Sequence, residues 1–95
     1  MGGSYRVRST ATFDRQVRKL TQRNLRIREA LIEAAALLQT DPYDLSDRAD
    51  IRKLVGIPAG EGRFRLRLGE YRLRYDVIGD DVILHSLRHR KESYR

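Results

Sequence analysis

The chain has 95 residues, which fits one domain over residues 1–95 and leaves no room for a second hydrophobic core. It contains no cysteine, which excludes a disulfide scaffold, a thiolate metal site and a cysteine nucleophile. Twenty Lys and Arg against 13 Asp and Glu give a net charge of +7, which suits phosphate backbones, acidic proteins or anionic lipid. No apolar run approaches the roughly 20 residues that cross a bilayer, so we expect a cytoplasmic protein without a membrane partner.

Arginine supplies most of the positive charge. It accounts for 17 of the 20 basic residues. Its planar guanidinium binds phosphate through two parallel hydrogen bonds and stacks on bases, whereas lysine acts as a point charge. A GC-rich genome would produce the same excess, so the positions of the arginines have to decide between the two explanations.

The N-terminal half is predicted to be one strand followed by two helices. Residues 5–8 alternate apolar and basic side chains, as a short half-buried strand does. Thr12 or Ser9 is expected to cap the first helix. The second helix ends at Asp41-Pro42 and has an apolar stripe at helical spacing, formed by Leu25, Ile27, Leu31, Ala34, Ala35 and Leu38.

The hydrophobic period then changes from 3.6 to 2. Residues 43–50 and 56–60 have the composition of loops, with a short strand possible at 51–54. Strands are predicted at 64–68, 71–77 and 82–88, joined by tight turns to form an antiparallel meander. The predicted fold is α+β with the order β-α-α-β-β-β, two N-terminal helices packing on one face of a small, mainly antiparallel sheet. Alternation places toward the core Tyr71, Leu73, Tyr75, Ile83, His85 and Leu87.

Arginines follow the other face of the predicted meander. Period-2 geometry puts Arg63, Arg65 and Arg67 on one side of their strand, and Arg72 and Arg74 beside them on the next strand. Cross-strand neighbours lie about 5 Å apart, so these cations repel one another unless an anion joins them. The acids expected to relieve part of that repulsion are Glu61, Glu70 and Asp76. The alternative is a solvated polar face with scattered ion pairs.

The C-terminal tail extends this basic surface. Residues 88–95 continue directly from the last strand and end in an aromatic residue, Tyr94, followed by Arg95. Aromatic and arginine side chains together form the stacking platforms of nucleic-acid-binding proteins. The residues alone therefore predict an α+β domain that binds RNA or DNA. Besides Arg65, Arg67 and Arg72, the candidate contacts to nucleic acid are Arg63, Arg74, His89, Arg90 and Lys91.

Three motifs together resemble the RelE/ParE superfamily, the toxins of type II toxin–antitoxin pairs. They are KLVG at 53–56, FRLRLGEYRLRY at 64–75 and HRKESY at 89–94. The family pattern is K-L-x-G, then Y-R-[IL]-R-[VL]-G-[DE]-Y-R-[IVL]-x-Y, then H-R-x-x-x-Y. The resemblance covers about the last 45 residues motif by motif, and it implies the same fold as the periodicity.

The resemblance also implies a reaction. The RelE branch cleaves messenger RNA in the ribosomal A site, beside 16S ribosomal RNA, without a metal or cofactor. Carried over to this chain, Arg65 and Arg67 form the basic strand pair and Arg72 contacts the phosphate. Arg88 serves the leaving group and Tyr94 stacks on the substrate. The position of Arg67 can be lysine in the family, where it is the base. Arginine stays protonated at neutral pH, so the base is His89, Tyr94, a ribosomal RNA group, or none.

Two other functions remain open at this stage. A ParE-like toxin has the same fold and inhibits DNA gyrase, but that branch generally lacks the full basic set and the closing tyrosine. A non-catalytic RNA-binding module would use the same surface without chemistry. The resemblance to a toxin further implies a small acidic antitoxin, partly disordered, that forms a hetero-oligomer with the basic chain.

Overall fold

A mixed five-stranded sheet organises the part of the chain that the computed structural model describes, residues 4–93. The strand order is β1-β5-β4-β3-β2, in which β1 runs parallel to β5 and the other neighbours are antiparallel. In chain order the elements are β1 (Arg6–Ser9), α1 (Ala11–Arg23), α2 (Leu25–Thr40), β2 (Ile51–Lys53), β3 (Phe64–Leu68), β4 (Tyr71–Ile78), β5 (Asp81–His89) and α3 (Arg90–Ser93). The predicted α+β class and its two N-terminal helices are confirmed.

Polar caps set the limits of the two long helices. Thr10 caps α1, because its hydroxyl oxygen accepts a hydrogen bond of 3.0 Å from the backbone N–H of Phe13. The predicted caps, Thr12 and Ser9, were therefore wrong. Asn24 ends α1 and begins α2, since its backbone N–H bonds to Leu20 while its side chain accepts from the next helix. The predicted stop of the second helix before Pro42 is confirmed.

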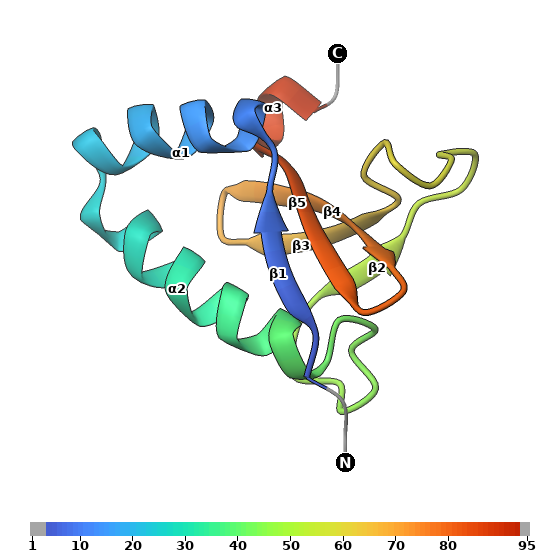
Figure 1. Ribbon diagram of the computed structural model, residues 1–95. Helices are drawn as coiled ribbons and strands as arrows, with labels where there is room; N and C mark the ends of the chain where they lie inside the picture. Colours follow the sequence, from blue (N-terminus) through green and yellow to red (C-terminus); the bar gives the residue numbers. More distant parts are fainter. Residues whose placement is uncertain (1–3, 94–95) are drawn as a thin grey trace.

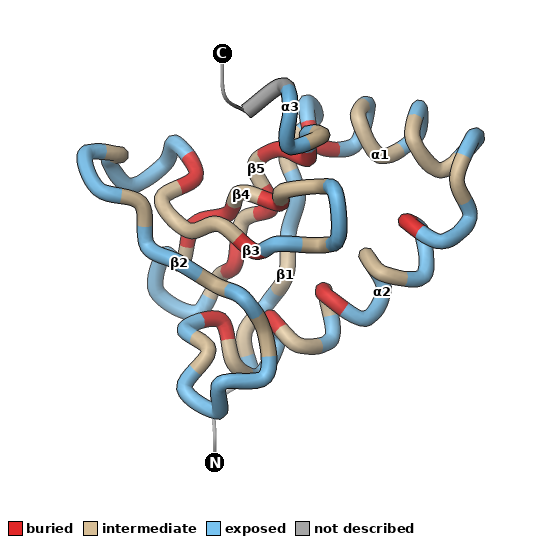
Figure 2. The backbone as a smooth tube through the Cα atoms, turned by 180° about the vertical axis from the view of Figure 1, so that it is seen from behind, coloured by how far each residue is buried: buried red, intermediate tan, exposed pale blue. Residues whose placement is uncertain are grey.

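The hydrophobic core lies between one face of the sheet and the two long helices (Figure 1). Figure 2 shows buried positions gathered on the middle strands and on the inward side of α2. Tyr75 is fully buried and its hydroxyl donates to the carbonyl of Pro42, so burial raises the pKa of this phenol. The buried apolar residues are Phe13, Ile27, Ala34, Leu38, Leu66, Leu73, Tyr75, Val82, Leu84 and Leu87.

A β-bulge changes the alternation of β5. Tyr75 pairs with Leu84, whereas the preceding residue of β4, Arg74, pairs with Ser86. His85 is the extra residue between these pairs. Val82 and Leu84 therefore face the core, and the prediction that Ile83 and His85 point there was wrong. Alternation gives no sign of the bulge, because residues 82–84 are three consecutive apolar residues and do not show which of them face the core.

Two short elements, β2 and α3, add to the predicted order. Strand β2 is present with three residues, shorter by one than the possible strand at 51–54. Helix α3 follows β5 at once, where the sequence predicted only a basic tail. Within residues 4–93, no helix is long and apolar enough to cross a membrane.

Candidate nucleic-acid interface

The register of the sheet lines arginines up in two rows on the face opposite the helices. One row runs from Arg67 to Arg72 and Arg88 on β3, β4 and β5. The other runs across β2, β3 and β4 through Arg52, Arg65 and Arg74, and ends at Ser86 on β5. Intervening residues such as Leu66 and Leu73 are buried in the core. We call this surface the arginine face. Directly opposed cations repel, so the face needs anions or hydrogen-bond acceptors.

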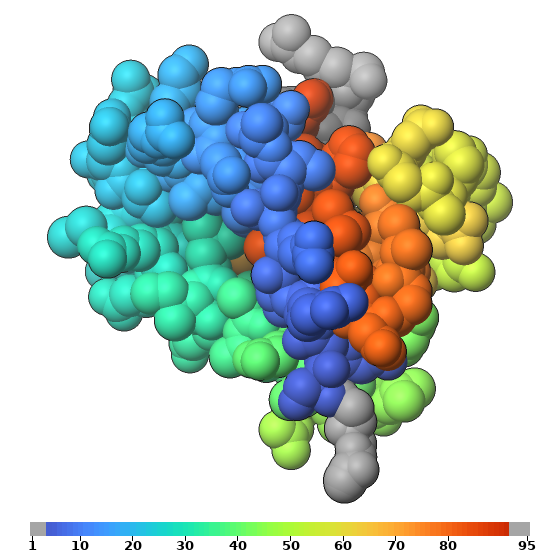
Figure 3. Space-filling view, in the orientation of Figure 1, coloured from blue at the N-terminus to red at the C-terminus, as the bar shows by residue number. Residues whose placement is uncertain are grey.

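A loop covers one half of the arginine face. This covering loop, residues 54–63, joins β2 to β3 and lies on the side of the sheet away from the helices (Figure 1). In Figure 3 it packs beside β4 and β5. The Asp76 carboxylate, only 2% exposed, accepts hydrogen bonds from the backbone N–H groups of Gly62 (2.9 Å) and Arg63 (3.0 Å). Burial opposes ionisation, but these donated hydrogen bonds outweigh it and lower the pKa of Asp76.

Two predicted RNA contacts are engaged by this loop. The guanidinium of Arg74 donates from Nε to the Gly62 carbonyl (3.0 Å) and from Nη2 to the Glu61 carbonyl (2.8 Å). Arg63 donates from Nε to the carbonyl of Ile57 at 3.4 Å. Both side chains therefore hold the covering loop. Asp76, predicted to relieve repulsion among the arginines, instead binds backbone N–H groups.

The remaining half of the face is open. Its row consists of Arg67, with a side chain 49% exposed, the half-buried Arg72, and the exposed Arg88. We call these three residues the open row. Arg65 lies next to the row and is largely buried, with a side chain 13% exposed and an Nε that has no hydrogen-bond partner among the described residues. The structure thus brings together the four strand arginines to which the resemblance gave catalytic roles.

An acid that sequence reasoning missed lies at the edge of this half. Asp50 accepts a hydrogen bond of 2.8 Å from Nη2 of Arg65, and its carboxylate is 3.9 Å from Arg52 and 4.0 Å from Arg67. Residues 43–50 were predicted only as a polar loop. Its position in the chain is the available signal, because Asp50 directly precedes β2. Once β2 pairs with β3, an acid at that position lies next to the arginines of both strands.

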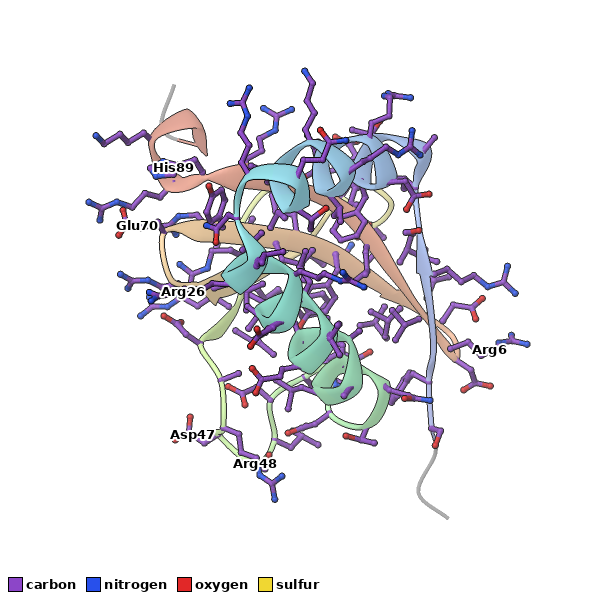
Figure 4. All side chains as sticks on the ribbon, turned by 90° about the vertical axis from the view of Figure 1, so that its left-hand side faces the viewer. Arg6, Arg26, Asp47, Arg48, Glu70 and His89 are labelled. Carbon is purple, nitrogen blue, oxygen red and sulfur yellow. The ribbon has the colours of Figure 1, made fainter. Side chains whose placement is uncertain are left out.

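The C-terminal residues form a second basic cluster, beside the start of β4 and the end of β5. Glu70 lies 3.3 Å from Arg90 and 3.8 Å from His89 (Figure 4). The His89 ring contacts Tyr71 edge to face, and its Nδ1 accepts a hydrogen bond from the backbone N–H of Lys91 at 3.2 Å. The predicted substrate-stacking residue, Tyr94, lies outside the described residues.

The chemistry of the face is that of an anion site. Guanidinium groups bind phosphate oxygens with charge-assisted hydrogen bonds, and a row with a spacing of about 5 Å offers several at once. Within residues 4–93, no three His, Asp or Glu side chains form a group that could hold a metal ion.

Comparisons place this architecture among known proteins. Residues 7–94 match the family model described as the ParE toxin of the type II toxin–antitoxin system parDE. The chain belongs to this toxin family. It is a type II toxin–antitoxin toxin of the RelE/ParE superfamily, which confirms the family indicated by the C-terminal motifs. A comparison with curated protein sequences gave no match.

Solved structures of RelE-type complexes share the fold of this family member. A chain of the RelB–RelE antitoxin–toxin complex from Methanococcus jannaschii is 26% identical, with a TM-score of 0.70 over 92% of this chain and 94% of that one. The toxin–antitoxin complex RelBE2 from Mycobacterium tuberculosis gives 29% identity and a TM-score of 0.69, over 90% and 98% of the two chains. The DinJ–YafQ complex of E. coli gives a TM-score of 0.74 over 97% and 99%, but at 14% identity the likeness is one of fold alone.

Proposed function

We propose that this toxin is a messenger-RNA endonuclease that acts on the ribosome, and that the open row binds the scissile phosphate. The observation that carries the proposal is the direct cross-strand alignment of Arg67, Arg72 and Arg88. Three neighbouring cations concentrate positive charge in one place, which is the requirement for stabilising a phosphate that gains charge in its transition state. The likeness to chains of RelB–RelE complexes at 26% and 29% identity supports the same branch of the superfamily.

The proposed reaction is attack of the 2′-oxygen on the adjacent phosphorus, with loss of the 5′-oxygen of the next nucleotide. The 2′-hydroxyl loses its proton, the new P–O bond forms a 2′,3′-cyclic phosphate, and the leaving oxygen takes up a proton. Arg72, at the centre of the row, is assigned to the phosphate oxygens, and Arg88 to the charge on the leaving oxygen. Arg65 and Arg67 fix the phosphate on the neighbouring strand.

No arginine of the row can accept the 2′-proton, because guanidinium remains protonated. His89 is poorly arranged for that role, since its Nδ1 already accepts the N–H of Lys91. We therefore assign His89, Arg90 and Lys91 to binding of the RNA backbone. Catalysis then rests mainly on charge and positioning, with Tyr94 or a ribosomal group close to the 2′-oxygen.

The proposed protein partner is an acidic antitoxin. The similar chains come from complexes that contain an antitoxin, and a net charge of +7 favours an acidic segment. An apolar groove of about 260 Å³ between α1, α2 and the sheet offers a place for its hydrophobic side chains. The groove is lined in part by Val17, Leu31 and Ile32, and Ile32 is 62% exposed. We place the proposed complex in the cytoplasm, where ribosomes translate.

Primer extension on a messenger RNA in a cell-free translation reaction tests the activity. Cuts at a fixed position within codons, dependent on ribosomes and weakened in Tyr94→Ala, are the expected result. Intact messenger RNA at toxin concentrations that stop translation in the reaction would contradict the proposal.

Gyrase inhibition is the second candidate, because the matching family model is described by the ParE toxin. A supercoiling assay with purified gyrase separates the two functions. Inhibition of supercoiling without RNA cleavage would assign the chain to that activity. RNA binding with neither effect would leave a non-catalytic module.

A further inference from the structure

The carboxylate of Asp50 lies among three arginines, where a phosphate group of bound RNA would also be attracted. Its Oδ1 is 2.8 Å from Nη2 of Arg65 and 3.9 Å from Nε of Arg52, and its Oδ2 is 4.0 Å from Nη1 of Arg67. The Asp50 side chain is 45% exposed, so solvent and ligands reach it. Its main chain is also fixed, since its carbonyl accepts the backbone N–H of Arg67 at 3.0 Å.

The loop before β2 holds Asp50 in place. The Asp41 carboxylate accepts from the backbone N–H groups of Leu45 (2.8 Å) and Ser46 (3.2 Å). Asp44 accepts in the same way from Arg48 (2.9 Å) and from Ala49 at 3.2 Å. These side-chain-to-backbone bonds close two consecutive turns directly before Asp50. The carboxylate is therefore presented by an ordered segment.

We propose that Asp50 is an internal competitor for the phosphate groups of RNA and sets how tightly the arginine face binds them. The inference rests on the proposed function, because it takes RNA as the ligand. A carboxylate presents two oxygens to a guanidinium as a phosphate does. RNA that reaches Arg65 and Arg67 has to displace Asp50 or share these cations with it. The competition lowers affinity for isolated RNA, so that binding depends on the further contacts a full substrate makes.

Binding of a non-cleavable RNA tests this role. The probe is a fluorescent ten-nucleotide RNA with 2′-O-methyl groups, titrated with the full chain at two salt concentrations. Asp50→Asn keeps the oxygen that accepts from Arg65 and removes the charge, so we expect affinity to rise roughly tenfold at low salt. The dependence of log affinity on log salt should steepen by about one unit, as for one additional phosphate contact.

Two variants serve as matched controls. Asp47→Asn makes the same charge change in the same loop, at an exposed residue whose positive φ of 56° suits asparagine. Asp47 lies at the outer edge of the molecule in Figure 4, and the variant should bind within twofold of the wild type. Asp50→Glu keeps the charge and should also remain near the wild-type affinity.

Unchanged or weaker RNA binding by Asp50→Asn would overturn the inference, and so would a tenfold gain in Asp47→Asn. A second measurement avoids any variant that fails to fold: the ¹³C shift of the Asp50 carboxyl carbon should change when RNA saturates the wild-type protein. An unperturbed carboxyl signal would overturn the inference. Cleavage of ribosome-bound messenger RNA by the wild type is scored separately, so failure of the competitor role leaves the proposed activity to its own test.

Discussion

Arg72 and Arg74 are two residues apart on β4 and lie on the same face of the sheet, but their surroundings differ. Arg74 donates to two carbonyls of the covering loop, at the end of the face where Asp76 holds that loop down. Arg72 lies between Arg67 and Arg88, in register with both. Arg74 thus holds the covering loop against the sheet, whereas Arg72 lies in a row of three arginines.

The difference shows that residue type and alternation do not decide what an arginine does. The deciding factor is which part of the fold lies against the guanidinium: the covering loop against Arg74, and the other arginines of the open row beside Arg72. A buried Asp76 and two loop carbonyls turn the covered half into a structural unit. The open half keeps its excess of positive charge, with Asp50 as the partial counter-charge. We therefore assign a role in stability to the covered half, and the proposed RNA cleavage would take place at the open half.

The largest expected effect is on cleavage. Replacing Arg88 by alanine removes an exposed cation at the end of the open row, and we expect the cleavage rate on ribosomes to fall about 100-fold. Stability should hardly change, because the side chain is exposed. Arg6→Ala is the control, since Arg6 is an exposed arginine on the edge strand β1, outside the open row, and is paired with Asp81 (Figure 4). Equal loss of cleavage in both variants would show that overall charge matters and the open row does not.

The next effect is on stability in the covered half. Asp76→Ala leaves the buried N–H groups of Gly62 and Arg63 without their acceptor, so we expect a loss of about 3 kcal/mol in the free energy of unfolding. Urea denaturation followed by circular dichroism measures it. Asp80→Ala, in the exposed β4–β5 turn, is the control and should change stability little. A loss below about 1 kcal/mol in Asp76→Ala would mean that this carboxylate does not anchor the loop.

The same carboxylate predicts a dependence on pH. Because the pKa of Asp76 in the folded chain lies below its usual value of 3.8, the ionised group stabilises the fold above that value. Its contribution is lost as the pH falls through the folded-state pKa. The difference in unfolding free energy between wild type and Asp76→Ala should therefore be constant near neutral pH and shrink below pH 3.8.

Asp41 also has a lowered pKa, chiefly through the hydrogen bond from the Ser46 hydroxyl, but it is present in both proteins and cancels in the difference. A stability difference that stays constant down to the lowest pH at which both proteins fold would contradict the assignment to Asp76.

The smallest effect concerns the close approach of the loop to β4. Gly62 has a φ of +79°, and a Cβ there would come within 3.0 Å of the Cβ of Arg74. We expect Gly62→Ala to cost about 1–2 kcal/mol, part of it from the left-handed backbone. Gly79→Ala is a matched control, because its φ is +59° and no atom lies within 4 Å of the added carbon. If both variants lose the same free energy of unfolding, the left-handed backbone explains the whole loss and the contact with Arg74 contributes nothing.

The sequence predicted the sheet and the arginine face well, because alternation in β3 and β4 is regular. Apolar residues such as Leu66 and Leu73 occupy one face, and the arginines between them must occupy the other. The resemblance of the motifs to the family then implied catalytic roles for several of these arginines together.

The division of the face could not be predicted from local patterns. It depends on contacts between segments far apart in the chain, such as Asp76 with Gly62 and Asp50 with Arg65. The bulge at His85 was missed for a related reason, since an inserted residue shows only in the pairing of two strands.

Parallel measurements on Arg72→Ala and Arg74→Ala test the division of the face most directly. For each variant, the rate of messenger-RNA cleavage on ribosomes and the free energy of unfolding are determined. We expect Arg72→Ala to lose about 100-fold in rate with little change in stability, and Arg74→Ala to lose about 1–2 kcal/mol in stability while cleaving within about threefold of wild type. Loss of cleavage in a stable, folded Arg74→Ala, or full cleavage by Arg72→Ala, would contradict the account.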